Sequence, residues 1–251
     1  MTRVIMHGCN GHMGVVISEI AANDPEVEIV AGIDINTEEK FGYPVFASIK
    51  DCDVEADAII DFSVVAAMND LLEYSAEKNV PVVLCTTGLT EDDMAKVKAT
   101  SEKVAVLKSA NMSLGINTVM KLLRLATEVL ADRGYDIEIV EKHHNQKVDA
   151  PSGTALALAD VINETKDNRY EYIYDRSQTR EKRSENEIGL SAVRGGTIVG
   201  QHDVIYAGID EVIEIHHTAY SKAVFGKGAI DAAKFIAGKG PGMYDMSDVI
   251  G

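Results

Sequence analysis

The feature that most constrains the fold is an alternation of short apolar runs with longer amphipathic stretches through residues 1–113. The apolar runs predict strands, and they are "RVIMHG", "VEIVAGID", "ADAIIDFS", "VPVVLCTTG" and "KVAVLKSAN". The stretches between them, such as "HMGVVISEIAAN" and "TEDDMAKVKATSEK", have the apolar spacing of helices. Strands that alternate with helices form a parallel sheet covered on both faces. We therefore expect a doubly wound α/β domain over residues 1–113.

The pattern changes after Asn111. "LGINTVMKLLRLATEVLAD" has the spacing of a long helix, the strand "YDIEIVEKHH" follows, and "SGTALALADVINET" is another helix. Three strand-like runs in 188–220 are separated by the turns "RGG" and "AGID", and we interpret them as an antiparallel meander. The charged segment 168–186 is expected to be a solvated loop. Residues 114–223 thus predict a smaller α+β domain, and the helix within 224–251 should pack on an existing domain.

Composition narrows the class of partner and the compartment. With 251 residues and 46% hydrophobic content, the chain can fill two modest cores. A formal net charge of -16 repels phosphate backbones, so we expect no nucleic-acid partner. No export signal begins the chain, and no window approaches the roughly 18 apolar residues of a membrane-spanning helix, so we expect no membrane partner. The three cysteines lack paired or metal-like spacing, which is typical of the cytoplasm, where we place the protein.

Three glycines, Gly8, Gly11 and Gly14, stand between the first strand and the first helix. Glycine permits a tight turn and a close approach of a pyrophosphate, and the helix start offers N–H groups and a positive dipole end. The spacing is G-x-x-G-x-x-G rather than G-x-G-x-x-G, so a plain tight turn is the alternative. Asp34 ends the second strand, where a carboxylate can accept hydrogen bonds from ribose hydroxyls; a solvated carboxylate is the alternative. The loop predicts a Rossmann-type dinucleotide site.

Two further strand ends are expected to complete this site, because ligands of open parallel sheets bind beyond the carboxyl ends of the strands. They are "CTTG" at 85–88 and "SANM" at 109–112. A nucleophilic Cys85 is the alternative, and it is disfavoured because no histidine lies beside it in the sequence. We expect these segments to line the nicotinamide.

The stretch "EKHHNQKVDAPSGTA" carries candidate acid–base chemistry. His143 can exchange a proton near neutral pH, and Lys147 is an acid or electrostatic partner nearby. Ser152 is placed to cap the next helix, whose first N–H groups form an anion site together with the lysine. The stretch therefore predicts a proton donor beside a site for a substrate carboxylate.

The other histidines and Arg194 have plainer interpretations. Adjacent histidines on a strand point to opposite faces, so neither His143 and His144 nor His216 and His217 form a metal site by themselves, and we expect no metal. One of His216 and His217 is expected in the core and the other in solvent. Arg194 is interpreted as a surface charge that flanks a turn.

From end to end, the chain resembles the bacterial 4-hydroxy-tetrahydrodipicolinate reductases, or dihydrodipicolinate reductases, of the diaminopimelate route to lysine. The motifs that carry the resemblance are "GCNGHMG", "IIDFS", "CTTG", "SANMSLGIN", "EKHHNQKVDAPSGTALALA", "AVRGGTIVGQH" and "GMYDMSDVI". The resemblance implies a homotetramer, an N-terminal nucleotide domain that takes in the C-terminal helix, and a middle domain that binds substrate and forms the tetramer sheet. It also implies NAD(P)H-dependent reduction of a dehydrated cyclic imine dicarboxylate to tetrahydrodipicolinate.

By position, the resemblance assigns two groups of site residues. The dinucleotide would be held by Gly8, Cys9, Asn10, Gly11, His12, Met13, Asp34, Cys85, Thr86, Thr87, Ser109, Ala110, Asn111 and Met112. His143 would be the main proton donor or acceptor, and Lys147 a second donor. His144, Gly153 and Thr154 would bind the substrate carboxylates.

Three positions depart from the common pattern of the family. Cys85 stands where glycine is frequent and Met112 where phenylalanine is frequent, at contacts made mainly by backbone. Ile35 stands where some members carry an arginine, and two glutamates follow before the first basic residue, Lys40. A 2'-phosphate would bring a second negative charge against Asp34 without a matching cation. We therefore expect NADH to be preferred, with NADPH as the second choice.

Two other functions fit parts of the pattern. Another two-domain dehydrogenase, acting on a sugar or an amino acid, would favour a base without the clamp at 152–154. A nucleotide-sensing binding protein would keep the glycine loop but would have no use for His143 and Lys147. The presence of both residues argues against the binding protein.

Overall fold

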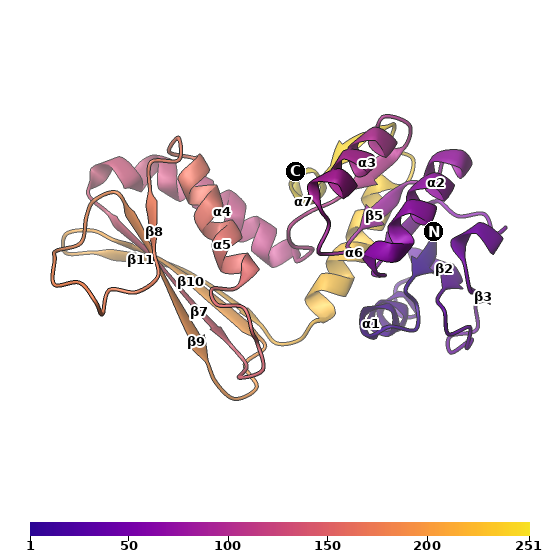
Figure 1. Ribbon diagram of the computed structural model, residues 1–251, viewed down its shortest axis with the longest axis horizontal. Helices are drawn as coiled ribbons and strands as arrows, with labels where there is room; N and C mark the ends of the chain where they lie inside the picture. The colour runs from indigo at the N-terminus through magenta and orange to yellow at the C-terminus, as the bar shows by residue number, and fades with distance from the viewer. The chain divides into compact units, whose positions relative to one another are not determined.

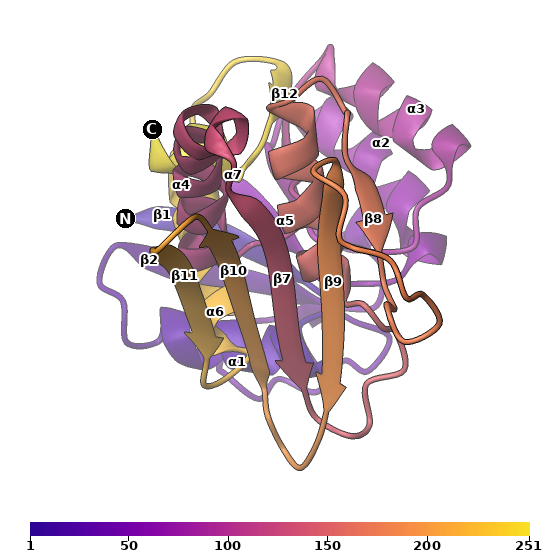
Figure 2. The same ribbon diagram turned by 90° about the vertical axis from the view of Figure 1, so that its left-hand side faces the viewer.

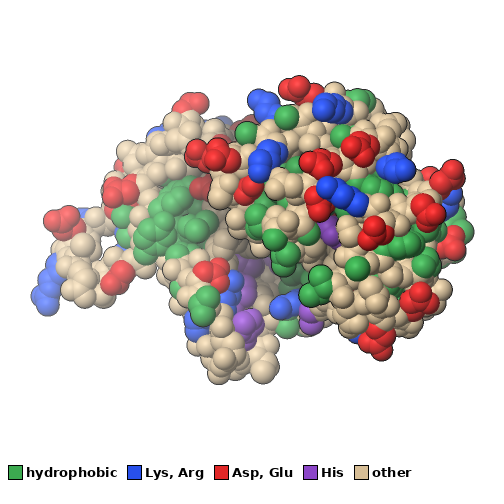
Figure 3. Space-filling model, turned by 45° about the vertical axis from the view of Figure 1, so that its right-hand side comes forward, with side chains coloured by type: hydrophobic (Ala, Val, Ile, Leu, Met, Phe, Trp, Pro, Cys, Tyr) green, Lys and Arg blue, Asp and Glu red, His purple; other side chains and the backbone are tan.

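The computed structural model describes all residues from Met1 to Gly251, which form two compact units (Figure 1). The terminal unit comprises Met1–Leu114 and Ala223–Gly251, and the central unit comprises Gly115–Lys222. None of the helices has both the length and the apolar character needed to cross a membrane. Acidic and basic side chains are interspersed over the face shown in Figure 3, so the net charge is not gathered there into one patch.

The terminal unit contains the predicted doubly wound sheet, with all of its strands parallel. In spatial order its strands are β12 (Gly242–Tyr244), β6 (Ala105–Leu107), β5 (Val82–Leu84), β4 (Ala58–Asp61), β1 (Thr2–His7), β2 (Val27–Ile33) and β3 (Val45–Phe46). Its helices are α1 (His12–Ala21), α2 (Met68–Lys78), α3 (Glu91–Ser101), α6 (Ala223–Ile236) and α7 (Met246–Ile250), with short 3-10 turns at Ile49–Asp51 and Val65–Ala67.

Successive residues of the central strands enter two different cores, which is why these strands are apolar throughout. In β1, Val4 and Met6 pack with α1 and α6, whereas Ile5 packs with α2 and α3. Val82 and Val83 of β5 divide in the same way. A strand buried on both faces gives a continuous apolar run rather than an alternating one. The predicted strands and crossover helices of this unit are confirmed.

The C-terminal segment contains more structure than the single helix expected from the sequence. After α6, the short strand β12 pairs in parallel with β6 at the edge of the sheet, and α7 follows it. Asp245 caps α7 through a capping box with Asp248. Three residues are too few for a periodic signal, so the sequence did not indicate β12.

The central unit is a five-stranded mixed sheet covered on one face by two helices, as Figure 2 shows. Its strands, in spatial order, are β11 (Val212–Ala219), β10 (Gly200–Ala207), β7 (Asp136–His143), β9 (Glu187–Arg194) and β8 (Glu171–Ile173). The helices are α4 (Leu114–Leu130), followed by a 3-10 turn at Ala131–Arg133, and α5 (Gly153–Glu164). Ile137, Ile139 and Val204 of the sheet pack with Leu123 of α4 and Leu158 of α5.

The predicted antiparallel meander over 188–220 is wrong in part. The hairpin of β10 and β11 is present, but β9 pairs in parallel with β7 and does not pair with β10. Strand β7 lies between them and pairs antiparallel with β10. The "RGG" turn does reverse the chain. A turn signal cannot reveal that an earlier strand occupies the space between the two arms.

The segment 168–186 is not simply a solvated loop. It contains β8, which pairs in parallel with β9. Arg176 and Arg183 both contact the Glu138 carboxylate of β7, at 3.0 Å each. Arg183 also pairs with Asp136 at 2.8 Å. These charges bind the segment to the sheet, and a local reading of the sequence treats them only as solvated.

Candidate functional site

Close backbone contacts require glycine at two positions, Gly8 in the loop between β1 and α1 and Gly14 in the first turn of α1. Gly8 has a φ of +83°, and a Cβ there would lie 2.6 Å from the carbonyl oxygen of Phe62. A Cβ on Gly14 would overlap the carbonyl oxygens of Gly8 and Cys9. Gly11 precedes α1 without a side-chain cap. A helix that packs directly on such a loop and begins without a side-chain cap fits a pyrophosphate.

Asp34 follows β2 and is fixed beside the glycine loop. Its Oδ2 accepts a hydrogen bond from the backbone N–H of Asn10 at 3.0 Å, and its Oδ1 accepts one from Asn36 at 3.0 Å. The Asn10 amide donates to the carbonyl oxygens of Asn36 and Glu38 at 2.6 and 3.0 Å. The next side chain, Ile35, is 95% exposed. The carboxylate therefore lies at the loop where the sequence placed it.

Sequence reasoning missed a buried polar cluster at the same edge of the sheet. Asp61 ends β4, and its Oδ1 lies 2.9 Å from Nδ1 of His7, which ends β1. The hydroxyls of Ser63 and Thr86 donate to the two Asp61 oxygens, each at 2.6 Å. Burial would raise the pKa of Asp61, but His7 and the two hydroxyls hold it below its ordinary value. The available signal was that two predicted strands end in polar residues, His7 and Asp61.

The segments 85–87 and 109–112 follow β5 and β6 at the edge that carries the glycine loop. Burial raises the pKa of the Cys85 thiol well above its usual range, which argues against a nucleophile. Lys108 donates from Nζ to the carbonyl oxygen of Thr86 at 3.2 Å. Met112 is buried in the core beneath α6. The parallel sheet thus brings the predicted dinucleotide contacts to the carboxyl ends of β1, β2, β5 and β6.

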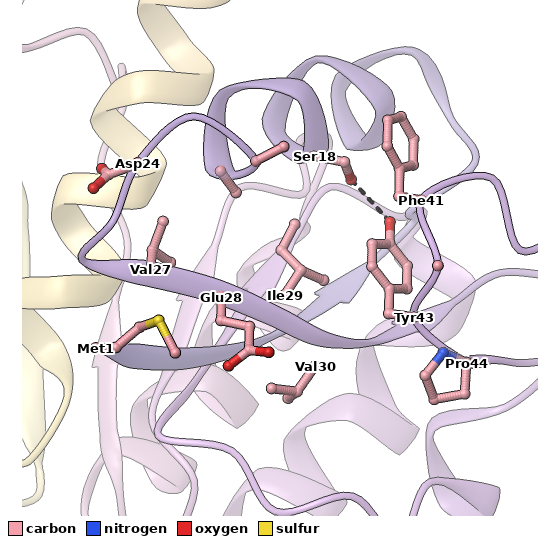
Figure 4. Close-up of a pocket in the computed structure, with 13 residues that line it drawn as sticks. Met1, Ser18, Asp24, Val27, Glu28, Ile29, Val30, Phe41, Tyr43 and Pro44 are labelled. Carbon is pink, nitrogen blue, oxygen red and sulfur yellow. Dashed lines mark hydrogen bonds between the residues drawn. The ribbon is translucent and has the colours of Figure 1, made fainter.

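A hollow of about 570 Å³ in the terminal unit lies away from these contacts. It is lined by α1, by the first residues of β2 and by the segment 41–44. Ser18 and Tyr43 point toward each other there and share a hydrogen bond of 2.8 Å (Figure 4). No residue predicted to hold the dinucleotide lines this hollow.

In the central unit, His143 is the last residue of β7 and is buried. Its Nδ1 lies 2.6 Å from Oε2 of Glu141, a fully buried carboxylate two residues earlier on the same face of the strand. The ring of His202, on β10, meets the His143 ring edge-on with 5.2 Å between centroids. Burial lowers the pKa of His202 to about 4, and the neighbouring His143 adds to the effect. His202 is therefore neutral near pH 7.

The interpretation of Arg194 as a surface charge is wrong. Its Nη1 donates to Oε2 of Glu141 at 2.8 Å, and its Nη2 donates to Oε1 at 2.7 Å. Its Nη2 also donates to the carbonyl oxygen of Asp149. Arg194 stands opposite His143 in the register of β7 and β9. The missed signal was the period of two along β7, which places Glu141 on the same face as His143. A carboxylate buried on that face needs a cationic partner.

The helix α5 begins as predicted, with Ser152 as its cap. The Ser152 hydroxyl accepts a hydrogen bond from the backbone N–H of Ala155 at 3.2 Å. Gly153 is exposed and Thr154 is half-buried, so the first turn is accessible. Before it, Lys147 forms an ion pair with Asp149 at 2.7 Å. The Lys147 ammonium lowers the pKa of Asp149, and the backbone N–H of Gly153 contributes further.

The predicted substrate residues therefore share one end of the central unit. His144 and Lys147 lie in the loop between β7 and α5, and the backbone N–H of Lys147 donates to the His144 carbonyl oxygen at 3.2 Å.

His216 is exposed and His217 is half-buried. The structure contains no group of three or more His, Cys, Asp or Glu side chains that could hold a metal ion.

Comparison with known proteins assigns both parts of the chain to one family. Residues 2–112 match the family profile described as dihydrodipicolinate reductase, N-terminus, and residues 115–250 match the profile described as its C-terminus. A 4-hydroxy-tetrahydrodipicolinate reductase of Caldanaerobacter subterraneus subsp. tengcongensis is 51% identical over 250 residues, covering 100% of this chain and 98% of that protein. One of Clostridium tetani is 48% identical over 246 residues, covering 98% of this chain and 96% of that protein.

A solved structure has the same fold. It is a dipicolinate-bound dihydrodipicolinate reductase from Paenisporosarcina sp. TG-14, with a TM-score of 0.83 and 22% sequence identity. The match covers 100% of this chain and 99% of that one. Together, the two profiles and the identity over the full length show that the chain belongs to the dihydrodipicolinate reductase family.

Proposed function

We propose that this protein is an NAD(P)H-dependent oxidoreductase that reduces the dehydrated cyclic imine dicarboxylate to tetrahydrodipicolinate in lysine biosynthesis through diaminopimelate. The observation that carries the proposal is at the end of β7. There, His143 is hydrogen-bonded to the buried carboxylate of Glu141, which also accepts a hydrogen bond from Ser152 at the start of α5. The relatives that share about half of this sequence are named for that reaction.

The terminal unit holds the dinucleotide in this proposal. The loop 8–13 and the start of α1 would hold the pyrophosphate, and Asp34 would accept hydrogen bonds from the adenosine ribose. The segments 85–87 and 109–112 line the nicotinamide end. Bound NAD(P)H supplies the hydride. NADH is the preferred form, because the exposed residue after Asp34 is Ile35 rather than a cation.

The central unit supplies the proton and binds the substrate. His143 is the main proton donor and Lys147 a second one, and general acid catalysis of this kind accelerates a reaction by roughly 10² to 10⁴. His144, Gly153 and Thr154 bind the substrate carboxylates at the accessible first turn of α5. The Lys147 ammonium is paired with Asp149, and its remaining N–H donors can contact a substrate.

The protein acts as a homotetramer in this proposal. The helices α4 and α5 cover only one face of the mixed sheet (Figure 2). The opposite face carries the exposed valines Val193 and Val212, as the strand register indicates. The same face also carries charged side chains such as Glu138 and Asp203, and a second subunit can cover it together with the valines. The cytoplasmic location expected from the sequence stays a prediction.

A coupled assay tests the function. The synthase that makes the cyclic precursor is incubated with its substrates, NADH and this protein, and NADH absorbance is followed. Absorbance should fall only when both proteins are present, and reactions that lack either protein serve as controls. A steady absorbance with both NADH and NADPH would refute the proposed function.

A further inference from the structure

One carboxylate contacts both the proposed proton donor and the start of the proposed substrate site. Oε2 of Glu141 lies 2.6 Å from Nδ1 of His143, and Oε1 accepts the backbone N–H of Ser152 at 2.9 Å. Arg194 donates to both oxygens. Burial would raise the pKa of Glu141, but Arg194, His143 and the Ser152 N–H together lower it, so the group is ionised. These four contacts engage both oxygens of the carboxylate and favour a single orientation.

The contact with Glu141 determines which ring nitrogen of His143 can react. Since Nδ1 donates to the carboxylate, only Nε2 is left to exchange a proton. Nε2 lies next to the backbone of Gly200, where an added Cβ would be 3.1 Å away. The edge of the His202 ring borders the imidazole on β10. The ring of His143 is thus held in one orientation by its neighbours.

Ser152 extends the same support to the helix start. Its backbone N–H is held by Glu141, its hydroxyl caps α5 through Ala155, and the hydroxyl also contacts Nε2 of His202 at 3.1 Å. The first turn of α5 therefore has a fixed position relative to His143. A single buried ion determines that position.

We propose that Glu141, held in place by Arg194, is the positioning residue of this active site, fixing His143 with Nε2 as the proton-exchanging atom and fixing Ser152 at the start of α5. The inference rests on the proposed function, because it takes His143 as the proton donor. Glu141 acts through these two residues and touches no substrate atom. Loss of its charge should therefore lower kcat and also weaken binding of a dicarboxylate.

The first test replaces Glu141 by glutamine, which keeps the shape and removes the charge. Glu141→Gln should lower kcat by roughly 10²- to 10⁴-fold, as when an orienting carboxylate is removed behind a catalytic histidine. The affinity for the dicarboxylate probe dipicolinate should fall by about tenfold, while NADH affinity, measured by fluorescence, stays within about twofold. The matched control is Glu138→Gln on the same strand, which loses the charge paired with Arg176 and Arg183 but lies on the opposite face.

Glu138 lies on the proposed subunit face, so Glu138→Gln is assayed as the tetramer, and it should then retain kcat and dipicolinate affinity within about twofold. Full activity in Glu141→Gln, or an equal loss in both variants, would overturn the positioning role. If Glu141→Gln does not fold, Glu141→Asp replaces it, because that variant keeps the charge for Arg194 but is too short to reach His143 and Ser152 together. Unchanged kcat in Glu141→Asp would count against the inference in the same way.

A double-mutant cycle separates positioning from general structural support. If Glu141 acts through the imidazole, adding Glu141→Gln to His143→Ala should change kcat by less than about twofold, because the residue it orients is gone. Multiplied losses would refute the inference. The unaltered protein separates failure of the proposed function from failure of the positioning role. If it shows no turnover, the proposed function is refuted. If it turns over normally and Glu141→Gln is equally active, only the role of Glu141 is refuted.

Discussion

The choice between NADH and NADPH depends on the few residues around Asp34, and its size can be worked out from them. Two unit charges 4 Å apart interact by about 1 kcal/mol in water and about 4 kcal/mol at an effective dielectric constant of 20. Asp34 is half-buried, and two backbone N–H groups already contact its oxygens, so the repulsion of a 2'-phosphate lies near the lower value. We expect NADH to be favoured by about 1 to 2 kcal/mol, or roughly five- to thirtyfold in kcat/KM.

The nearby cation does not remove this preference. Lys40 is the first basic residue after Asp34, and its Nζ lies 3.7 Å from the carboxylate of Glu38. An ammonium on a flexible chain also lacks the two-pronged geometry with which arginine binds a phosphate. A guanidinium directly after Asp34 would supply the missing donor.

The perturbation is therefore Ile35→Arg. Because Ile35 is 95% exposed, the change disturbs no core. It should raise kcat/KM for NADPH by about tenfold, the size of one charge-assisted contact, and change the value for NADH by less than about twofold. Ile35→Gln is the matched control, since it adds a polar chain without charge. The gain should shrink in 1 M salt, where the Debye length is about 3 Å.

Initial rates with each nucleotide at saturating substrate provide the measurement. Equal use of NADH and NADPH by the unaltered protein would refute the reasoning, because a cation from elsewhere would then reach the phosphate. An increase in Ile35→Gln as large as that in Ile35→Arg would show that charge is not the cause. A clear preference for NADPH would mean that Asp34 does not lie at the ribose.

Four further predictions concern proton transfer, substrate binding, pH and assembly. His143→Ala and Lys147→Ala should each lower kcat by about 10² or more and leave NADH affinity unchanged; full activity in both would contradict their roles. Thr154→Ala should raise KM for the dicarboxylate more than it lowers kcat, because the carboxylate charge does not change along the reaction, and steady-state rates check this. The folded pKa of His202, about 4, lies below the unfolded value of about 6.5, so its contribution to stability is complete above pH 6.5 and is lost as the pH falls toward 4. Lowering the pH from 7.5 to 5 should therefore remove about 2 kcal/mol of unfolding free energy. Denaturant titrations of His202→Gln should lose this pH dependence, and those of the exposed control His12→Gln should keep it. Light scattering should give a tetramer, and a well-behaved monomer would contradict the subunit contact.

The sequence predicted the elements whose signals are local. Each strand of the doubly wound sheet from β1 to β6, apart from the two-residue β3, shows an apolar run, and Ser152 could be placed as a cap from its own neighbours. The position of β9 beyond β7 could not be predicted, because strand order depends on contacts between residues far apart in the sequence.

The same limit applies to the candidate site. The motif around His143 could be recognised in the sequence, whereas the contact of Arg194 with Glu141 that supports it could not. Arg194 lies 53 positions from Glu141 along the chain and reaches it only through the parallel pairing of β7 and β9. The Asp61 cluster likewise joins the ends of neighbouring strands. Residues that react can be read from short motifs, but residues that hold them in place depend on tertiary contacts.

The terminal unit is built from both ends of the chain, and this has a consequence during synthesis on the ribosome. Helix α6 packs against α1 and supplies core residues from Ala229 to Ile236, and β12 completes the sheet beside β6. All of these arrive after the central unit has been translated. Strands β1 to β6 therefore wait with one apolar face covered by α1 but not by α6, while Gly115–Lys222 can already fold. A chain released before Ala223 would leave the part of that face under α6 exposed permanently, and such a fragment is a substrate for chaperones and proteases rather than a smaller working protein.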